Sequence, residues 1–66
     1  MDKLVILIPT YNESENIENL LSRLDAARIY LSKEYLVDLL IIDDSSPDKT
    51  AQIAKSITIE RLSVLI

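Results

Sequence analysis

The stretch Ile8–Glu13, with the sequence IPTYNE, joins the end of an apolar segment to the start of a polar one. Leu4–Ile8 is an uninterrupted run of Leu, Val and Ile, which is typical of a strand covered on both faces in a parallel α/β sheet. Pro9 has no N–H to donate to a strand ladder, so we expect the strand to end there. The stretch therefore predicts a strand that leads through a polar turn into a helix.

The residues after this turn have the pattern of an amphipathic helix. Asn12 is a favoured N-cap residue, which explains it better than a role as a ligand, and Glu15 follows in the position of a capping box. The next apolar side chains keep helical spacing on one face, and polar side chains take the other. The apolar ones are Ile17, Leu20, Leu21, Leu24, Ala27 and Leu31. We therefore predict a helix over residues 13–31.

A second stretch, Leu39–Asp48, repeats the order of apolar strand, polar turn and helix start. Its apolar part, residues 39–42, predicts the second strand, with Asp38 at the entrance. Ser46 or Asp48 can cap a second helix, with Pro47 allowed in the first turn. We predict this helix over residues 48–57.

The last part of the chain predicts a third strand near Leu62–Ile66, because it mixes β-branched and other apolar residues. The order β-α-β-α-β implies right-handed crossovers and a parallel sheet. We therefore expect an α/β fold in three layers around one parallel sheet. Residues 1–66 are then a single unit, which we expect to be the front part of a larger domain.

The composition excludes several classes of function. The net charge of −4 argues against nucleic-acid binding, which needs a basic face. The chain has no cysteine and no histidine, which excludes disulfides and removes the usual zinc ligands and the usual general base. It also has no glycine, so no glycine-rich phosphate loop is present. The apolar runs are shorter than the ~18 residues of a membrane span, and the N-terminus lacks a signal-peptide pattern. We expect a cytoplasmic location.

Both polar turns are expected at the carboxyl ends of the strands, where open α/β sheets bind ligands. Successive strand side chains point to opposite faces, so Asp43 and Asp44 cannot both face one ligand. One is expected to face the crevice and the other to brace the turn. Tyr11 offers a flat face for stacking on a base, and Glu13 can accept hydrogen bonds from ribose or base. Each has a structural alternative: Tyr11 packs on the sheet end, Glu13 favours the helix dipole, and the aspartates are turn carboxylates.

The two motifs together resemble the start of the family 2 glycosyltransferases. They are Ile8–Ile17, with the sequence IPTYNESENI, and Ile41–Thr50, with the sequence IIDDSSPDKT. The most similar subgroup is the polyprenol (dolichyl) phosphate mannosyltransferases, and the resemblance covers nearly the whole chain. It implies the N-terminal half of a Rossmann-like (GT-A) nucleotide-diphospho-sugar transferase domain. The implied activity is transfer of a sugar, such as mannose or glucose, from a GDP- or UDP-sugar to a polyprenyl phosphate.

The resemblance also implies which residues touch the donor nucleotide. Pro9, Tyr11 and Glu13 line the pocket for base and ribose. Ile42 and Asp44, at the end of the second strand, touch the nucleoside. Of the two adjacent aspartates, the first is then left to support the turn.

Two departures from the family pattern matter. Ser45 and Lys49 stand where many members have glycine, and if the turn needs positive φ there, a residue with a Cβ atom adds strain. The family's Asp-x-Asp metal motif, catalytic base and acceptor-binding part have no counterpart in these 66 residues. The Mg²⁺ or Mn²⁺ ion of the full-length family therefore has no expected ligands here, and we assign no catalytic or metal-binding residue. We expect the chain alone to be inactive.

Three further expectations complete this interpretation. The first strand is interior in the full family fold, so Leu4–Ile8 is expected to form an exposed apolar edge here and to allow self-association. One alternative function is a non-catalytic nucleoside-binding module. A more distant one is a receiver-like signalling domain, in which an acidic pair holds Mg²⁺. In receiver domains that pair ends the first strand and a later aspartate accepts the phosphoryl group, whereas here the pair ends the second strand and no aspartate follows Asp48.

Overall fold

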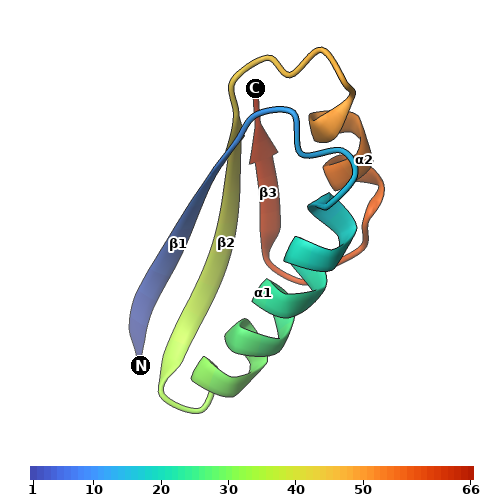
Figure 1. The fold of residues 1–66 in the computed structure, drawn as a ribbon. Coiled ribbons are helices and arrows are strands. Elements are labelled where there is room, and N and C mark those ends of the chain that lie inside the picture. The colour runs from blue at the N-terminus through green and yellow to red at the C-terminus, as the bar shows by residue number, and fades with distance from the viewer.

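The computed structural model describes all residues of the chain, 1–66. The elements follow in the order β1 (Asp2–Thr10), α1 (Ile17–Leu31), β2 (Tyr35–Asp43), α2 (Thr50–Ser56) and β3 (Leu62–Leu65) (Figure 1). The predicted alternation of strands and helices is confirmed, and so is the third strand. Neither helix has the length and apolar content that a membrane-spanning helix requires.

The strands form one parallel sheet in the order β1-β2-β3, so β2 is central and β1 lies at an edge. Both the parallel sheet and the edge position of the first strand are confirmed. At the carboxyl end of the β1–β2 pair, Pro9 lies opposite Ile42 and Thr10 lies opposite Asp43. Because both strands run in the same direction, the turns that follow them lie side by side at the carboxyl end of the sheet.

Both helices cover the same face of the sheet (Figure 1). Ile17 and Leu21 of α1 and Ala54 of α2 form the core with Leu39 and Ile41 of β2, and all of these side chains are buried. Right-handed crossovers that step in one direction across a sheet place their helices on one side of it. The chain therefore has two layers, and the third layer that we predicted is not formed by these residues.

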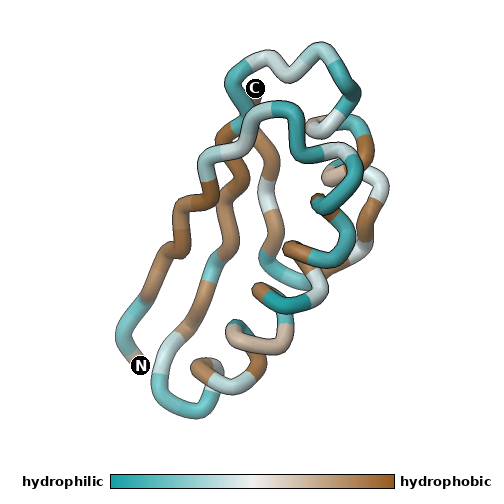
Figure 2. The backbone as a smooth tube through the Cα atoms, in the orientation of Figure 1, coloured by the Kyte–Doolittle hydropathy of each residue, from teal (hydrophilic) through white to brown (hydrophobic).

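The opposite face of the sheet is open and largely apolar. The side chains of Val5, Leu7, Leu36 and Leu65 are exposed on it. In Figure 2 the strands are mostly brown, whereas the connections after β1 and β2 are mostly teal and white. The prediction that the first strand is covered on both faces is therefore wrong within this chain. An unbroken apolar run shows that both faces can be buried, but it does not supply the partner that buries the second one.

β1 does not end at Pro9, as we predicted, but continues to Thr10. The carbonyl oxygen of Thr10 accepts the N–H of Asp44, which shows that this residue faces β2. Alternate residues of a parallel strand turn their backbone groups to opposite sides, so the nitrogen of Pro9 faces the free edge. A proline is compatible with a strand at such a position because no ladder hydrogen bond is lost.

β2 begins at Tyr35, earlier than the predicted start, so Asp38 lies inside the strand rather than at its entrance. Its carboxylate is paired on the open face with Lys3 Nζ at 3.2 Å and with Arg61 Nε at 2.6 Å. Burial raises the pKa of Asp38, but the hydrogen bonds and charges of Lys3 and Arg61 outweigh it, and the net effect is a lowered pKa. Two cationic neighbours thus allow an aspartate within the central strand.

Both helices begin later than predicted, α1 at Ile17 and α2 at Thr50. Asn12 is not the N-cap of α1. It has a φ of 54°, in the left-handed region that asparagine tolerates better than most residues. The residue at the N-cap position is Asn16, and its side chain makes no capping hydrogen bond. Pro47 likewise lies before α2 rather than in its first turn. The residues before both helices are held instead by hydrogen bonds between the two turns.

Candidate functional site

The turns after β1 and β2 are joined side by side at the carboxyl edge of the sheet. Thr10 Oγ1 donates a hydrogen bond of 2.8 Å to Asp43 Oδ1, and the Asp44 N–H donates one of 3.1 Å to the carbonyl oxygen of Thr10. Thr10 and Asp43 are both buried. The last residue pair of the β1–β2 ladder is therefore locked by a side-chain bond as well as by the backbone.

Asp43 is the buried support of the second turn. Its carboxylate accepts hydrogen bonds from Thr10 Oγ1, from the Ser46 N–H at 2.8 Å and from Ser46 Oγ at 2.6 Å. Burial raises the pKa of Asp43, but the hydrogen bonds from Ser46 and Thr10 favour the ionised form more strongly, so that the pKa lies below its usual value. The prediction that Asp43 supports the turn is confirmed.

Side chains of the second turn also hold the backbone of the first. The N–H groups of Asn12, Glu13 and Ser14 donate hydrogen bonds to Ser46 Oγ at 3.0 Å, to Thr50 Oγ1 at 2.9 Å and to Asp48 Oδ2 at 3.0 Å, respectively. These N–H groups precede α1 and have no helical acceptor of their own. Side chains far away in the sequence therefore satisfy N–H groups that would otherwise need a local N-cap or water.

Asp48 connects the two turns to the start of α2. Its Oδ1 accepts hydrogen bonds from both the N–H and the hydroxyl of Thr50, the first residue of the helix. Asp48 thus bonds to the start of the second helix, as predicted. The N-cap position itself is held by Lys49, the next residue. The hydrogen bond from the Thr50 hydroxyl, together with the Ser14 N–H, lowers the pKa of Asp48 to about 2 against the opposing effect of burial.

The residues predicted to touch a nucleoside lie around this joined pair of turns. Pro9 and Ile42 are neighbours across the β1–β2 ladder, and both are exposed. Tyr11 and Asp44 follow the two strand ends and are also exposed, whereas Glu13 is half-buried. Strand alternation places Pro9 and Ile42 on the open face, away from the helices. The five residues therefore share one edge of the sheet, where they form a surface rather than an enclosed cavity.

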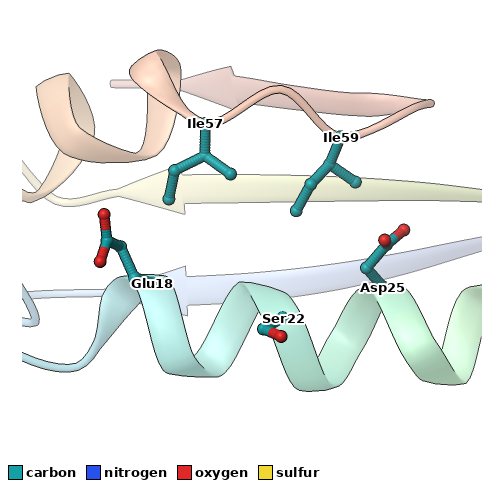
Figure 3. Close-up of a pocket in the computed structure, with 5 residues that line it drawn as sticks. All are labelled: Glu18, Ser22, Asp25, Ile57 and Ile59. Carbon is teal, nitrogen blue, oxygen red and sulfur yellow. The ribbon is translucent and has the colours of Figure 1, made fainter.

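The hollows of the molecule lie elsewhere. One is lined by Glu18, Ser22 and Asp25 of α1 and by Ile57 and Ile59 of the connection between α2 and β3 (Figure 3). Another lies at the end of α1, around Tyr30, Leu31, Lys33 and Glu34. Neither contains a residue that the sequence predicts to contact a ligand.

The chain offers no ready site for a divalent cation. No group of three or more acidic side chains lies close enough together to hold a metal ion. Of the aspartates near the turns, Asp43 and Asp48 already accept hydrogen bonds through both of their carboxylate oxygens. The donor set of these residues thus does not fit a bound Mg²⁺ or Mn²⁺ ion.

The two positions at which the resemblance leads us to expect glycine both have a left-handed backbone. Ser45 has a φ of 52° and Lys49 has a φ of 69°. In this region a Cβ atom crowds the backbone, and only glycine is free of the cost. The suspicion that the turn requires positive φ at Ser45 and Lys49 is confirmed.

Sequence reasoning missed the residues that tie the turns together. Neither Thr10 nor Thr50 is predicted to bond across the turns, yet both are buried and both do so. One signal for Thr10 is available: strand alternation gives it the same orientation as Ile8, so its hydroxyl needs a buried partner. For Thr50, the nearby Asp48 is a local partner, but the hydrogen bond from Glu13 joins positions 37 apart and no local pattern indicates it.

Comparison with known proteins identifies the wider group. The sequence profile described as "Glycosyl transferase family 2" matches residues 5–65. The chain is 43% identical over 56 residues to a dolichol-phosphate mannosyltransferase of Pyrococcus furiosus. It is 45% and 42% identical over 51 and 50 residues to the undecaprenyl-phosphate 4-deoxy-4-formamido-L-arabinose transferases of Photorhabdus laumondii and Klebsiella pneumoniae. No solved structure matches the chain significantly.

These matches cover unequal shares of the two partners. They include 85%, 77% and 76% of this chain, but only 15% of each relative. The chain thus spans a small part of the length of the curated relatives that it matches. The family profile, in contrast, extends from β1 to β3 and includes both joined turns. The resemblance seen in the two motifs is confirmed, and the chain belongs to glycosyl transferase family 2.

Proposed function

We propose that this chain forms the nucleoside-binding part of the donor site in a family 2 sugar transferase. The observation that carries the proposal is the joining of the β1 and β2 turns at the carboxyl end of the sheet, which holds the turn that carries Tyr11 and Glu13 against the turn that carries Asp44. Tyr11 stacks on the base, and Glu13 and Asp44 accept hydrogen bonds from base or ribose. Pro9 and Ile42 provide the apolar floor. This edge is where open α/β sheets place their ligands.

The donor in this proposal is a GDP- or UDP-sugar, with mannose or glucose as the sugar, and the acceptor is a polyprenyl phosphate. The names of the relatives support the acceptor, since dolichol phosphate and undecaprenyl phosphate are both polyprenyl phosphates. Because such an acceptor is a lipid, we place the reaction at the cytoplasmic face of a membrane.

We further propose that the 66-residue chain binds nucleotide without transferring sugar. Transfer in this family needs a divalent cation to neutralise charge on the diphosphate leaving group. The chain has no cluster of acidic side chains that could hold the ion, and it has no histidine to act as a base. The chain therefore recognises part of the donor, and the chemistry depends on groups that it does not contain.

Calorimetric titration of the chain with GDP and with UDP, each with and without Mg²⁺, tests this function. We expect binding of one nucleotide with little effect of Mg²⁺. We expect Tyr11→Ala to weaken it at least about fivefold, since stacking a base on an aromatic ring contributes about 1–3 kcal/mol. Asp44→Ala should weaken it at least about tenfold, since a hydrogen bond to a charged group contributes about 1.5–3 kcal/mol.

Matched controls are available on the same chain. Tyr30→Ala and Asp2→Ala remove an exposed tyrosine and an exposed aspartate away from the turns, and both should leave the affinity unchanged. Failure of both nucleotides to bind at millimolar concentration would refute the proposed function. Binding that survives Tyr11→Ala and Asp44→Ala would show that the site lies elsewhere.

We also propose that the chain self-associates through β1. This strand of nine residues forms a free edge of the sheet, and its residues Val5 and Leu7 expose apolar side chains on the open face. Unpaired backbone groups next to an apolar surface are a template for pairing with another chain.

A further inference from the structure

The hydrogen bonds from Asn12, Glu13 and Ser14 to the second turn form a continuous set, which we call the clasp. Three successive backbone N–H groups are received by Ser46 Oγ, Thr50 Oγ1 and Asp48 Oδ2, within a narrow range of 2.9–3.0 Å. Every donor is on the first turn, and every acceptor is on the second turn or is Thr50, the first residue of α2. The clasp thus fixes the backbone that carries Tyr11 and Glu13 relative to the backbone that carries Asp44.

The acceptors of the clasp are themselves held in place. Thr50 is fully buried, and its hydroxyl donates to Asp48 while it receives the Glu13 N–H. Ser46 Oγ donates to the buried carboxylate of Asp43. No acceptor can therefore rotate away without losing a second hydrogen bond, and in this sense the clasp is rigid.

Few other bonds hold the segment that the clasp restrains. Residues 11–16 belong to no strand or helix, and Asn12 adopts a left-handed conformation with a φ of 54°. The carbonyl oxygen of Glu13 accepts the N–H groups of Asn16 and Ile17, which ties the segment to α1, and Thr10 ties its other end to β2. Between these ends the clasp makes the remaining hydrogen bonds of the backbone.

We infer that Ser46, Asp48 and Thr50 are positioning residues for nucleotide binding, which act on the ligand through the clasp and do not touch it. The inference rests on the proposed function, since it assigns Tyr11, Glu13 and Asp44 to the ligand. Binding is stronger when contact groups are held in the bound geometry beforehand, because less conformational entropy is lost on association. Loss of a clasp acceptor therefore lowers affinity even though every contact residue remains.

Thr50 provides a sharp test because it has two conservative replacements. Thr50→Val keeps the β-branched shape but removes the hydroxyl, and Thr50→Ser keeps the hydroxyl. We expect Thr50→Val to weaken nucleotide binding about tenfold, because it loses both the hydrogen bond from Glu13 and the one to Asp48. Thr50→Ser should stay within about twofold of the original chain. Thr58→Val, the same change at an exposed threonine outside the clasp, should have no effect.

Amide spectra separate positioning from folding. In Thr50→Val, the ¹H–¹⁵N signals and hydrogen exchange of Glu13 and its neighbours in the first turn should change, while signals from the α1–β2 core stay in place. If Thr50→Val does not fold, Ser46→Ala serves instead, because Ser46 is only half-buried and receives the Asn12 N–H. It should likewise lower affinity in a folded chain.

The outcomes are distinct. If the original chain binds neither GDP nor UDP, the proposed function falls, and the clasp has no binding role. If the original chain binds and folded Thr50→Val or Ser46→Ala binds equally well, the clasp proposal alone is overturned. Equal losses in Thr50→Val and Thr50→Ser would also overturn it, because the effect would then not depend on the hydroxyl.

Discussion

Adjacent aspartates in this chain have opposite surroundings. Asp43 is 2% exposed and has three hydrogen-bond donors around it, whereas Asp44 is exposed and bonds only through its backbone N–H to Thr10. Strand alternation predicts that the two side chains point to opposite faces. Asp43 has the same orientation along β2 as the buried Leu39 and Ile41, so its side chain points inward.

This contrast predicts different costs for the same substitution. Asp43→Asn replaces one carboxylate oxygen with an NH₂ group that faces an existing donor, so it should lower the free energy of unfolding by about 1–3 kcal/mol. Asp44→Asn should change it by less than about 0.5 kcal/mol, as is usual for surface positions. Urea denaturation of both variants at neutral pH measures the difference. Equal stability of the two variants would contradict the supporting role of Asp43.

Backbone conformation predicts opposite effects of glycine at two lysines. Lys49 has a φ of 69°, and Lys55 lies in the last turn of α2. Lys49→Gly should raise the free energy of unfolding by about 0.5–1 kcal/mol, because relief of a left-handed strain of about 1–2 kcal/mol exceeds the entropic cost of glycine. Lys55→Gly should lower it by up to about 1 kcal/mol, which is the cost of glycine in a helix interior. Thermal and urea unfolding check the signs, and a loss of stability in Lys49→Gly would show that the left-handed conformation is not strained.

At the scale of elements, the order of strands and helices was predictable, but the helix starts were not. The spacing of Ile17, Leu21 and Leu24 locates α1 correctly, because its apolar face is a local pattern. The capping rule, in contrast, assumes that a helix start satisfies its N–H groups locally. Here the acceptors for Asn12 and Ser14 come from residues 34 positions away, and local sequence carries no sign of them. The two turns thus form one hydrogen-bonded unit, which requires the sheet to hold them side by side.

The ionisation of Asp48 should couple this unit to pH. Its folded pKa is about 2 and the ordinary value is 3.8, so the folded state binds the proton less readily. The stabilisation from ionised Asp48 is complete above the ordinary value and is lost as the pH falls from about 4 to about 2. Asp38 and Asp43 also have lowered pKa values and add to acid destabilisation in the same direction.

Asp48→Asn isolates this contribution. The free energy of unfolding, measured in urea at several pH values between 2 and 6, should fall less steeply toward low pH in Asp48→Asn than in the original chain. The variant is also expected to be less stable at pH 6. The charged oxygen that accepts the Ser14 N–H is replaced by a neutral amide oxygen or by an NH₂ group, which accepts no hydrogen bond. Parallel pH profiles would show that Asp48 does not carry the effect.

At the scale of the whole molecule, the sheet has one covered face, one open face and a free edge at β1. Composition and periodicity indicate how much apolar surface the chain has, and here the topology decides which part of it is covered. Both helices lie on one side, so Leu7 and Leu65 remain exposed on the other. The fold class was therefore predictable from the sequence, whereas a third layer would need a partner for the open face that these residues do not supply.

Self-association through β1 should respond to charge on this surface. Leu7→Lys places a charge on the edge strand. Because natural sheets use such charges to prevent edge pairing, the substitution should shift the chain toward monomer. Ile29→Lys is the matched control on α1, because Ile29 is 55% exposed and Leu7 is 59% exposed. Sedimentation velocity at increasing concentration compares the variants. A monodisperse original chain that melts cooperatively would contradict the proposed association.

The clasp has a further consequence for the charged part of a nucleotide. In many strand–turn–helix units, the free N–H groups before the helix bind phosphate. Here Asn12, Glu13 and Ser14 have already donated theirs to the second turn, and the Thr50 N–H is donated to Asp48. Exposed Asp44 adds negative charge at the same edge of the sheet. These four amides are therefore not available to a diphosphate, and the charge of Asp44 opposes one. Under the proposed function, the residues of the two turns contact the uncharged parts of a nucleotide sugar.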